Sequence, residues 1–217
     1  MQKSDYRVRL RYRLEKEVES LWWQVENETE NVLFGSGVEK ATGSNKSSNQ
    51  AQAGLASVVS QKLASSRGLI NIQHVKGTSD TALGNVCVLK AEIALAEGSN
   101  PSNYMTCLER TLKRIPQDSD AMAALSRILS RSNKGQSSDL SRSRLLASEA
   151  LSISPSSDRA SFALMKAYLH NNQREEAEIA AEQALSLNAD NPDLRDAVLA
   201  AFSNGDWWFQ SQANASP

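Results

Sequence analysis

The sequence DRASFALMKAYLHNNQREEAEIAAEQALSLNA, from Asp158 to Ala189, determines the fold that we expect for the larger part of this chain. When Asp158 is position 1, positions 7, 11, 20, 24 and 27 hold Leu164, Tyr168, Ala177, Ala181 and Ala184. This spacing is typical of two amphipathic helices whose alanines allow a short interaxial distance. A bulky side chain at position 20 or 27 would force the helices apart.

The end of this segment occurs three times in the chain, at Thr111 to Pro116, Ala150 to Pro155 and Ala184 to Ala189. Pro116 and Pro155 lie 39 residues apart, whereas Pro155 and Ala189 lie 34 apart, which is the period of tetratricopeptide repeats. We therefore predict helical repeats at about 85–118, 119–157 and 158–191, with a closing helix at 192–203. The extra residues of repeat two fall in the polar stretch from 131 to 142.

The other two repeats match the pattern less closely. Repeat two has Ser143 at position 20 but keeps the other positions, with Leu125, Leu129, Ala147 and Ala150. Repeat one has Tyr104 and Thr111 at positions 20 and 27. The residues from 80 to 217 as a whole nevertheless predict an all-α, tetratricopeptide-like array.

Strict alternation of apolar and basic residues predicts a strand near the start of the chain. Four arginines at 7, 9, 11 and 13 separate Tyr6, Val8, Leu10, Tyr12 and Leu14. A hairpin in which paired residue numbers add to 33 places Tyr12 opposite Leu21, Arg11 opposite Trp22 and Arg7 opposite Glu26. A basic strand could follow nucleic-acid phosphates, but this register supplies a tryptophan and a carboxylate to the arginines. We therefore predict a solvated sheet face.

The remaining elements of this part are shorter. We predict a third strand at 32–38, a helix that begins at Ser47 or Ser48 and ends at Gly68, and a fourth strand at 69–75. Of the adjacent Trp22 and Trp23, one enters the core and the other lies outside. Residues 1–79 thus predict a small mixed α/β subdomain with the order β-β-β-α-β, and the whole chain an α+β fold.

The order of these parts resembles a bacterial architecture. Similar segments follow one another in the same order behind the winged-helix domain of ToxR-like one-component regulators and in related cyclase-associated repeat proteins. In this chain the segments are Ser4 to Leu10, Thr29 to Phe34, a helix that ends in Ser66 to Ile70, and the helical repeats. The resemblance implies a regulatory domain that senses a ligand or partner. It also implies that the α/β subdomain is incomplete at its N-terminus, with a DNA-binding part upstream of Met1, with or without a membrane span.

Tetratricopeptide arrays bind peptides or ligands along the first helix of each repeat. On this register, the wall would present Arg127, Arg131, Arg159, Phe162, Lys166 and His170. Such a groove could hold an acidic peptide or a carboxylate ligand through bidentate arginine contacts. The alternative is that these cations are ordinary helix-surface residues. His170 could sense pH, or it could contact only the end of its helix.

Composition excludes several other functions. The 217 residues carry a net charge of −1, which gives no general attraction to nucleic acid or anionic lipid, and no apolar stretch is long enough for a membrane span. We find no phosphate-binding glycine loop, no metal-spaced cluster around His74 or elsewhere, and no nucleophilic triad. We therefore expect no catalytic residue, no cofactor, no metal and no nucleic-acid contact in this part.

Two further expectations concern cysteines and aromatics. Cys87 and Cys107 fall on the two antiparallel helices of repeat one, offset by four residues along the axis. This offset, added to the separation of the helices, exceeds the Cα distance that a disulfide allows, so we predict two buried, reduced thiols. Trp207, Trp208 and Phe209 cannot all face inward on one short helix. At least one of them either caps the last repeat or packs on a partner, which would be a second copy or the missing upstream segment.

The leading hypothesis is a non-enzymatic sensory or protein-interaction module of a bacterial transcription regulator, with a protein or small acidic ligand as partner and a homodimer as one arrangement. The second hypothesis is a free-standing tetratricopeptide adaptor or chaperone in secretion or envelope assembly. The compartment stays open: it is cytoplasmic for a soluble regulator and periplasmic for the C-terminal domain of a membrane-anchored one.

Overall fold

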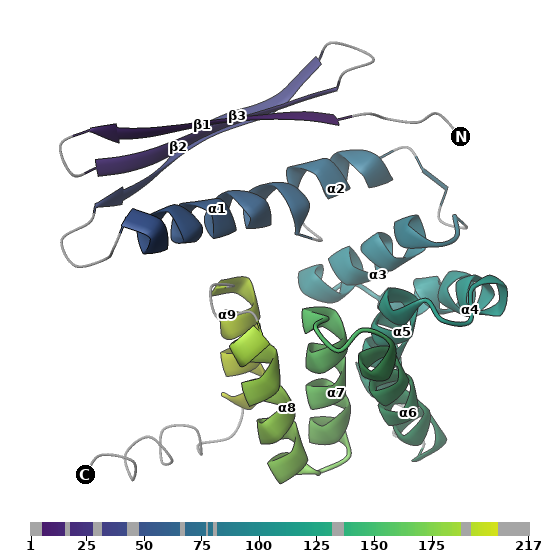
Figure 1. The fold of residues 1–217 in the computed structure, drawn as a ribbon. Coiled ribbons are helices and arrows are strands. Elements are labelled where there is room, and N and C mark those ends of the chain that lie inside the picture. Colours follow the sequence, from purple (N-terminus) through teal and green to yellow (C-terminus); the bar gives the residue numbers. More distant parts are fainter. Residues whose placement is uncertain are drawn as a thin grey trace, which may run out of the picture. The chain divides into compact units, whose positions relative to one another are not determined.

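The computed structural model describes residues 6–15, 18–27, 32–42, 48–65, 68–76, 78–79, 82–131, 137–187 and 192–203. A three-stranded antiparallel sheet is followed by helices (Figure 1), which confirms the α+β class with a helical C-terminal part. The chain divides into two compact units, Met1–Thr78 and Ser79–Pro217, which we call the sheet unit and the helical unit. None of the described helices is both long and apolar enough to cross a bilayer.

The sheet contains β1 (Tyr6–Glu15), β2 (Val18–Asn27) and β3 (Val32–Thr42) in the order β1-β2-β3. The β1–β2 register is the predicted one in which paired numbers add to 33. The predicted arginine partners are also present: the Arg11 guanidinium lies 5.9 Å from the Trp22 ring centroid, and Arg7 donates to Glu26 at 3.4 Å. The alternation of side chains therefore determined this hairpin.

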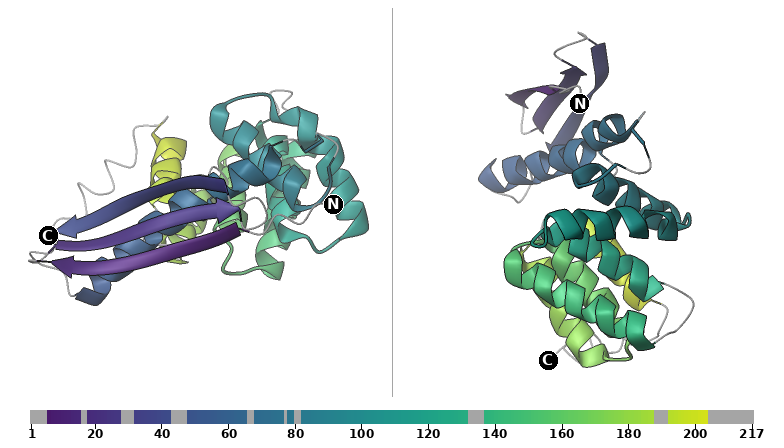
Figure 2. Two further views of the ribbon diagram at one scale, coloured as in Figure 1. Left: turned by 90° about the horizontal axis from the view of Figure 1, so that it is seen from above. Right: turned by 90° about the vertical axis from the view of Figure 1, so that its right-hand side faces the viewer.

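Helix α1 (Ser48–Ala64) packs on one face of the sheet, along β2 and β3 (Figures 1 and 2). Its Leu55, Val59 and Leu63 recur every four residues and form a buried cluster with β2. Trp23 joins this cluster, while Trp22 lies on the other face, as predicted. A Cβ atom on Gly37 would lie 2.7 Å from the Trp23 ring, so this position favours glycine.

The predicted fourth strand is wrong, because Leu69–Val75 forms a short helix, α2. Leu69 and Ile70 pack against the sheet-unit core, and the Asn71 amide donates to the carbonyls of Ala64 and Ser65, both at 2.9 Å. These bonds supply partners to carbonyls at the end of α1. A run of seven residues has too few repeats to distinguish alternation from helical spacing.

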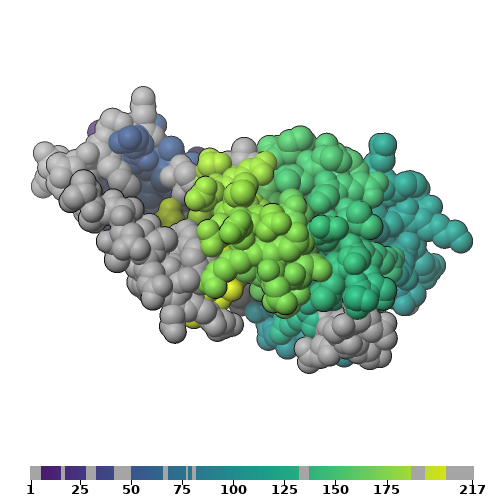
Figure 3. Space-filling view, turned by 90° about the horizontal axis from the view of Figure 1, so that it is seen from below, coloured from purple at the N-terminus to yellow at the C-terminus, as the bar shows by residue number. Residues whose placement is uncertain are grey.

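The helical unit contains α3 (Asn85–Glu97), the 3-10 turn η1 (Pro101–Tyr104), α4 (Met105–Arg114), α5 (Ser119–Arg131), α6 (Ser137–Ile153), α7 (Asp158–His170), α8 (Arg174–Leu187) and α9 (Pro192–Phe202). Helix α5 packs against α3, α4, α6 and α7, and α8 packs against α7 and α9. In the space-filling view the colours of the helical unit therefore follow chain order, from teal α4 to yellow-green α8 (Figure 3).

Small residues allow close packing in this unit. Ala147 and Ala150 of α6 and Ala177, Ala181 and Ala184 of α8 are fully buried. Ser143, which stands at position 20 of repeat two where repeat three has alanine, is also fully buried. Its hydroxyl donates to the Ser126 carbonyl at 3.0 Å, and the Ser126 hydroxyl donates to the Ser143 carbonyl at 2.8 Å. The two serines thus satisfy each other across the α5–α6 contact.

The prediction of reduced cysteines is wrong, because Cys87 and Cys107 form a disulfide with their Cα atoms 6.1 Å apart. The prediction assumed a continuous second helix, but η1 precedes α4. A 3-10 turn rises about 2.0 Å per residue against about 1.5 Å in an α-helix, which reduces the axial offset between the two cysteines. Both cysteines are buried, so the bridge lies inside the core of α3, α4 and α5.

Candidate functional site

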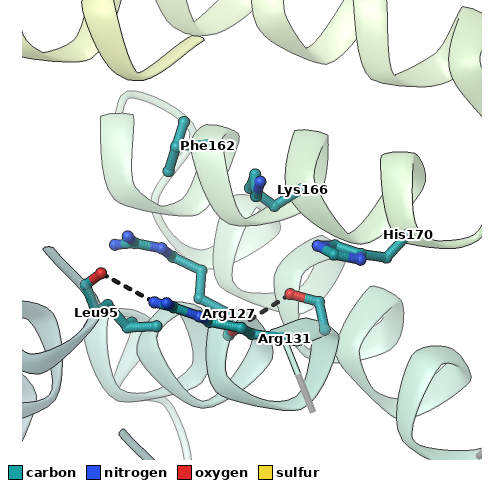
Figure 4. A pocket seen from close by; sticks show the side chains of 7 residues that line it. Leu95, Arg127, Arg131, Phe162, Lys166 and His170 are labelled. Carbon is teal, nitrogen blue, oxygen red and sulfur yellow. Dashed lines mark hydrogen bonds between the residues drawn. The ribbon is translucent and has the colours of Figure 1, made fainter. Parts of the chain in front are cut away.

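A basic pocket of about 330 Å³ lies between α3, α5 and α7 in the helical unit (Figure 4). Helix α7 contributes Phe162, Lys166 and His170, which share one face because they are four residues apart. Helix α5 contributes a second stripe opposite them, and α3 contributes an apolar edge; these residues are Arg127, Ser130, Arg131 and Leu95. Three helices therefore converge on a surface rich in hydrogen-bond donors.

The structure brings five of the six predicted groove residues to this pocket, namely Arg127, Arg131, Phe162, Lys166 and His170. The sixth, Arg159, does not line it. Its guanidinium pairs instead with the Asp120 carboxylate of α5 at 3.0 Å. This pair joins the first turns of α5 and α7. The predicted aromatic interface at Trp207, Trp208 and Phe209 lies outside the described residues.

Arg127 is held by internal partners. Its guanidinium forms an ion pair with Glu92 of α3 and stacks over the Phe162 ring, 5.0 Å from the centroid. The Glu92 side chain is 7% exposed and that of Arg127 is 17% exposed. Because both charges are largely removed from water, each depends on the other. Arg127 therefore links α3, α5 and α7 and is not an available ligand contact.

The sequence interpretation missed the contributions of α3, Glu92 and Leu95. Repeat one departs most from the pattern, so no groove residue was predicted from it. A signal was nevertheless present, since Glu92 interrupts the mostly apolar run from Val86 to Ala96. An acid in such a run indicates a buried, paired carboxylate.

Arg131 and Ser130 also have partners within the unit. The Arg131 guanidinium donates to the Leu95 carbonyl at 3.1 Å, which leaves further N–H groups of this fork-shaped side chain for a ligand. The Ser130 hydroxyl donates to the Arg127 carbonyl at 3.0 Å. Arg131 is therefore oriented by the backbone of α3, and its charge is not neutralised by that contact.

Lys166 differs from both arginines, because it makes no hydrogen bond or ion pair with any other described residue. Burial lowers the pKa of its ammonium group, and the nearby Arg127 and Arg131 lower it further. Three cations thus line the pocket, and of these Arg127 is paired with a carboxylate, that of Glu92. An anion placed between Lys166 and Arg131 would gain charge-assisted hydrogen bonds and relieve this repulsion.

We predict that Lys166→Met stabilises the free protein. Folding lowers the pKa of this lysine, so the charged side chain has a higher free energy in the folded state than in the unfolded state. At neutral pH it is protonated in both states, and its charge therefore reduces the stability. Methionine has a similar length and no charge, so we expect the melting temperature to rise by about 2 °C. Thermal unfolding followed by circular dichroism checks this, and a lower melting temperature would contradict it.

We predict that acidification destabilises the helical unit through His170. Burial, and then the charge of Lys166, lower the pKa of His170 below its usual 6.5. The unfolded state therefore binds the proton first, so stability present above pH 6.5 is lost as the pH falls through the lowered pKa. Arg131 also lines the pocket, and none of the lining residues carries a carboxylate that would oppose this shift.

His170→Gln provides the comparison for this pH effect. Between about pH 7.5 and pH 5.5, we expect the wild type to lose slightly more in melting temperature than the variant. The difference should be small because His170 is exposed and solvent screens its charge. Parallel slopes for the two proteins would contradict the role assigned to His170.

Among the described residues, no group of three or more His, Cys, Asp or Glu side chains could hold a metal ion. The basic pocket has the wrong charge for a cation, and His74 lies in α2 of the sheet unit. Comparison with protein-family models gives no match, and a search of the curated proteins finds no matching sequence.

Proposed function

We propose that the helical unit is a tetratricopeptide-like array that binds an anionic ligand or an acidic peptide segment. In this proposal, the chain is the non-enzymatic sensory or protein-interaction module of a bacterial transcription regulator. The starts of α3, α5 and α7 support the repeat assignment, since they fall at residues 85, 119 and 158 where repeats were expected. The fully buried alanines of α6 and α8 support it as well.

The observation that carries the binding proposal is the position of Lys166. A half-buried ammonium beside two guanidiniums destabilises the free protein, and no described residue compensates it. Functional sites commonly keep such groups because the ligand supplies the missing partner. We therefore assign the ligand anion to Lys166 and Arg131, with His170 beside them.

The shape of the pocket suggests the rest of the ligand. Phe162 and Leu95 give an apolar wall beside the cations, so a carboxylate carried on a short apolar group would fit better than a free inorganic ion. An acidic side chain of an extended peptide meets the same requirement. Substitutions meant to test binding should avoid Arg127, because its loss would leave the buried Glu92 carboxylate without its paired cation.

The regulatory part of the proposal rests on the resemblance in the order of elements. A reading frame that continues upstream of Met1 into a winged-helix segment would support it, whereas a true start at Met1 would favour the free-standing adaptor. The disulfide favours the periplasmic compartment of the two that the sequence left open, because such bonds persist in oxidising environments.

A thermal-shift screen tests the binding function. Succinate, citrate, inorganic phosphate and an oligoglutamate peptide would be compared with neutral succinamide. We expect the anions with carboxylates to raise the melting temperature, and we expect added salt to reduce the effect. A shift by succinamide equal to that by succinate, or no shift by any anion, would contradict the proposal.

A further inference from the structure

The apolar row of β1 is exposed although it lies on the core-facing side of the sheet. Val8, Leu10, Tyr12 and Leu14 are 41, 58, 40 and 57% exposed. Their register partners are the β2 residues that face α1, but α1 packs along β2 and β3. β1 is also the edge strand, and no described strand pairs with its second edge. The sheet unit therefore presents an apolar strip beside a row of unpaired backbone groups.

The opposite face of β1 is cationic. Arg7, Arg9, Arg11 and Arg13 lie on it, and the β2–β3 register adds Lys40. Among the described residues of the three strands, the carboxylates on this face belong to Glu26, which Arg7 and Arg9 share, and to Glu15, which pairs with Arg13 at 2.6 Å. These arginine side chains are roughly half or more exposed, so the face keeps a surplus of accessible positive charge.

We propose that the edge of β1 binds an extended segment of another protein in which apolar and acidic residues alternate. Such a segment would add a fourth strand and satisfy the outward N–H and C=O groups of β1. Its apolar residues would cover the strip from Val8 to Leu14, and its carboxylates would lie beside the arginines on the other face. Both rows of β1 would then have complementary neighbours.

The β1 strand of a second copy meets this requirement poorly. When two β1 strands pair antiparallel with Leu10 opposite Leu10 and their apolar rows on one face, every arginine lies opposite an arginine. A shift by one residue places apolar side chains opposite arginines instead. Charge on an edge strand opposes self-pairing in this way. The exposed apolar strip likewise favours a protein segment over a nucleic acid, which would use the cationic face alone.

Hydrogen exchange of the full-length chain tests the proposal. The probe is a peptide of the length of β1 in which valine and glutamate alternate, and the control peptide alternates valine and lysine. We expect the glutamate peptide to slow amide exchange in residues 6–15 and to bind about tenfold more tightly than the lysine peptide. A glutamate peptide with N-methylated backbone should lose this protection, because it cannot donate to the edge.

A charge-reversed protein sharpens the test. Arg9 and Arg13 are both exposed, so the double variant Arg9→Glu/Arg13→Glu should fold, which circular dichroism would verify. We expect it to prefer the lysine peptide. Equal binding of both peptides, protection that survives N-methylation, stronger protection by a single-stranded oligonucleotide, or protection that appears on self-association without peptide would each overturn the proposal.

Discussion

Arg127→Met is expected to lower the free energy of unfolding of the helical unit by about 3–5 kcal/mol. The substitution removes the cation paired with Glu92, whose side chain is 7% exposed. The second carboxylate oxygen, Oε1, already lacks a hydrogen-bond partner among the described residues. The variant also loses the contact of the guanidinium with the Phe162 ring. Urea unfolding followed by far-UV circular dichroism would measure the change.

The double variant Arg127→Met/Glu92→Met is the matched control. Two apolar side chains of similar size leave no buried charge, so we expect the double variant to regain most of the stability lost in the single one. A loss below about 1 kcal/mol in Arg127→Met, or a larger loss in the double variant, would contradict the structural role of the pair.

Removal of the disulfide is the second large effect that we expect. Cys87 and Cys107 are 20 residues apart, and closure of a loop of this size stabilises a fold by about 3 kcal/mol, mainly through the unfolded state. The double variant Cys87→Ala/Cys107→Ala should lower the free energy of unfolding by this amount. Alanine suits these buried positions better than serine, because it introduces no hydroxyl group.

Chemical reduction provides a control for the cysteine variant. We expect a reductant to lower the stability of the wild type to nearly that of the alanine variant, and to leave the variant unchanged. Titration of the denatured, unreduced wild type should find no free thiol. Two thiols in that titration would contradict the bridge.

The sheet unit shows how far a short pattern can be interpreted. The ten-residue strand β1 alternates strictly, and Leu21, Trp23 and Val25 of β2 share one face, so the register of the pair could be predicted residue by residue. The seven residues of α2 could not be assigned, because contacts with the end of α1 decide between helix and strand. The alternation likewise could not predict that the apolar row of β1 is exposed. Alternation identifies two faces of a strand but not what covers them.

The candidate site was predictable in part for a similar reason. Helical spacing places Lys166 and His170 on one face of α7, and the repeat register places Arg131 on α5 opposite them. The pairing of Arg127 with Glu92 and of Arg159 with Asp120 could not be predicted, because each joins two helices whose relative rotation depends on packing. These pairs separate the structural arginines from the cations that remain for a ligand.

The most direct test is calorimetric titration of the anion that gives the largest thermal shift, with the wild type, Lys166→Met and Lys113→Met. Lys113 is an exposed residue of α4 outside the pocket, so its variant controls for the loss of one charge. We expect Lys166→Met to weaken binding about 10- to 100-fold while Lys113→Met binds like the wild type. Unchanged affinity in Lys166→Met would contradict binding of an anion in the basic pocket.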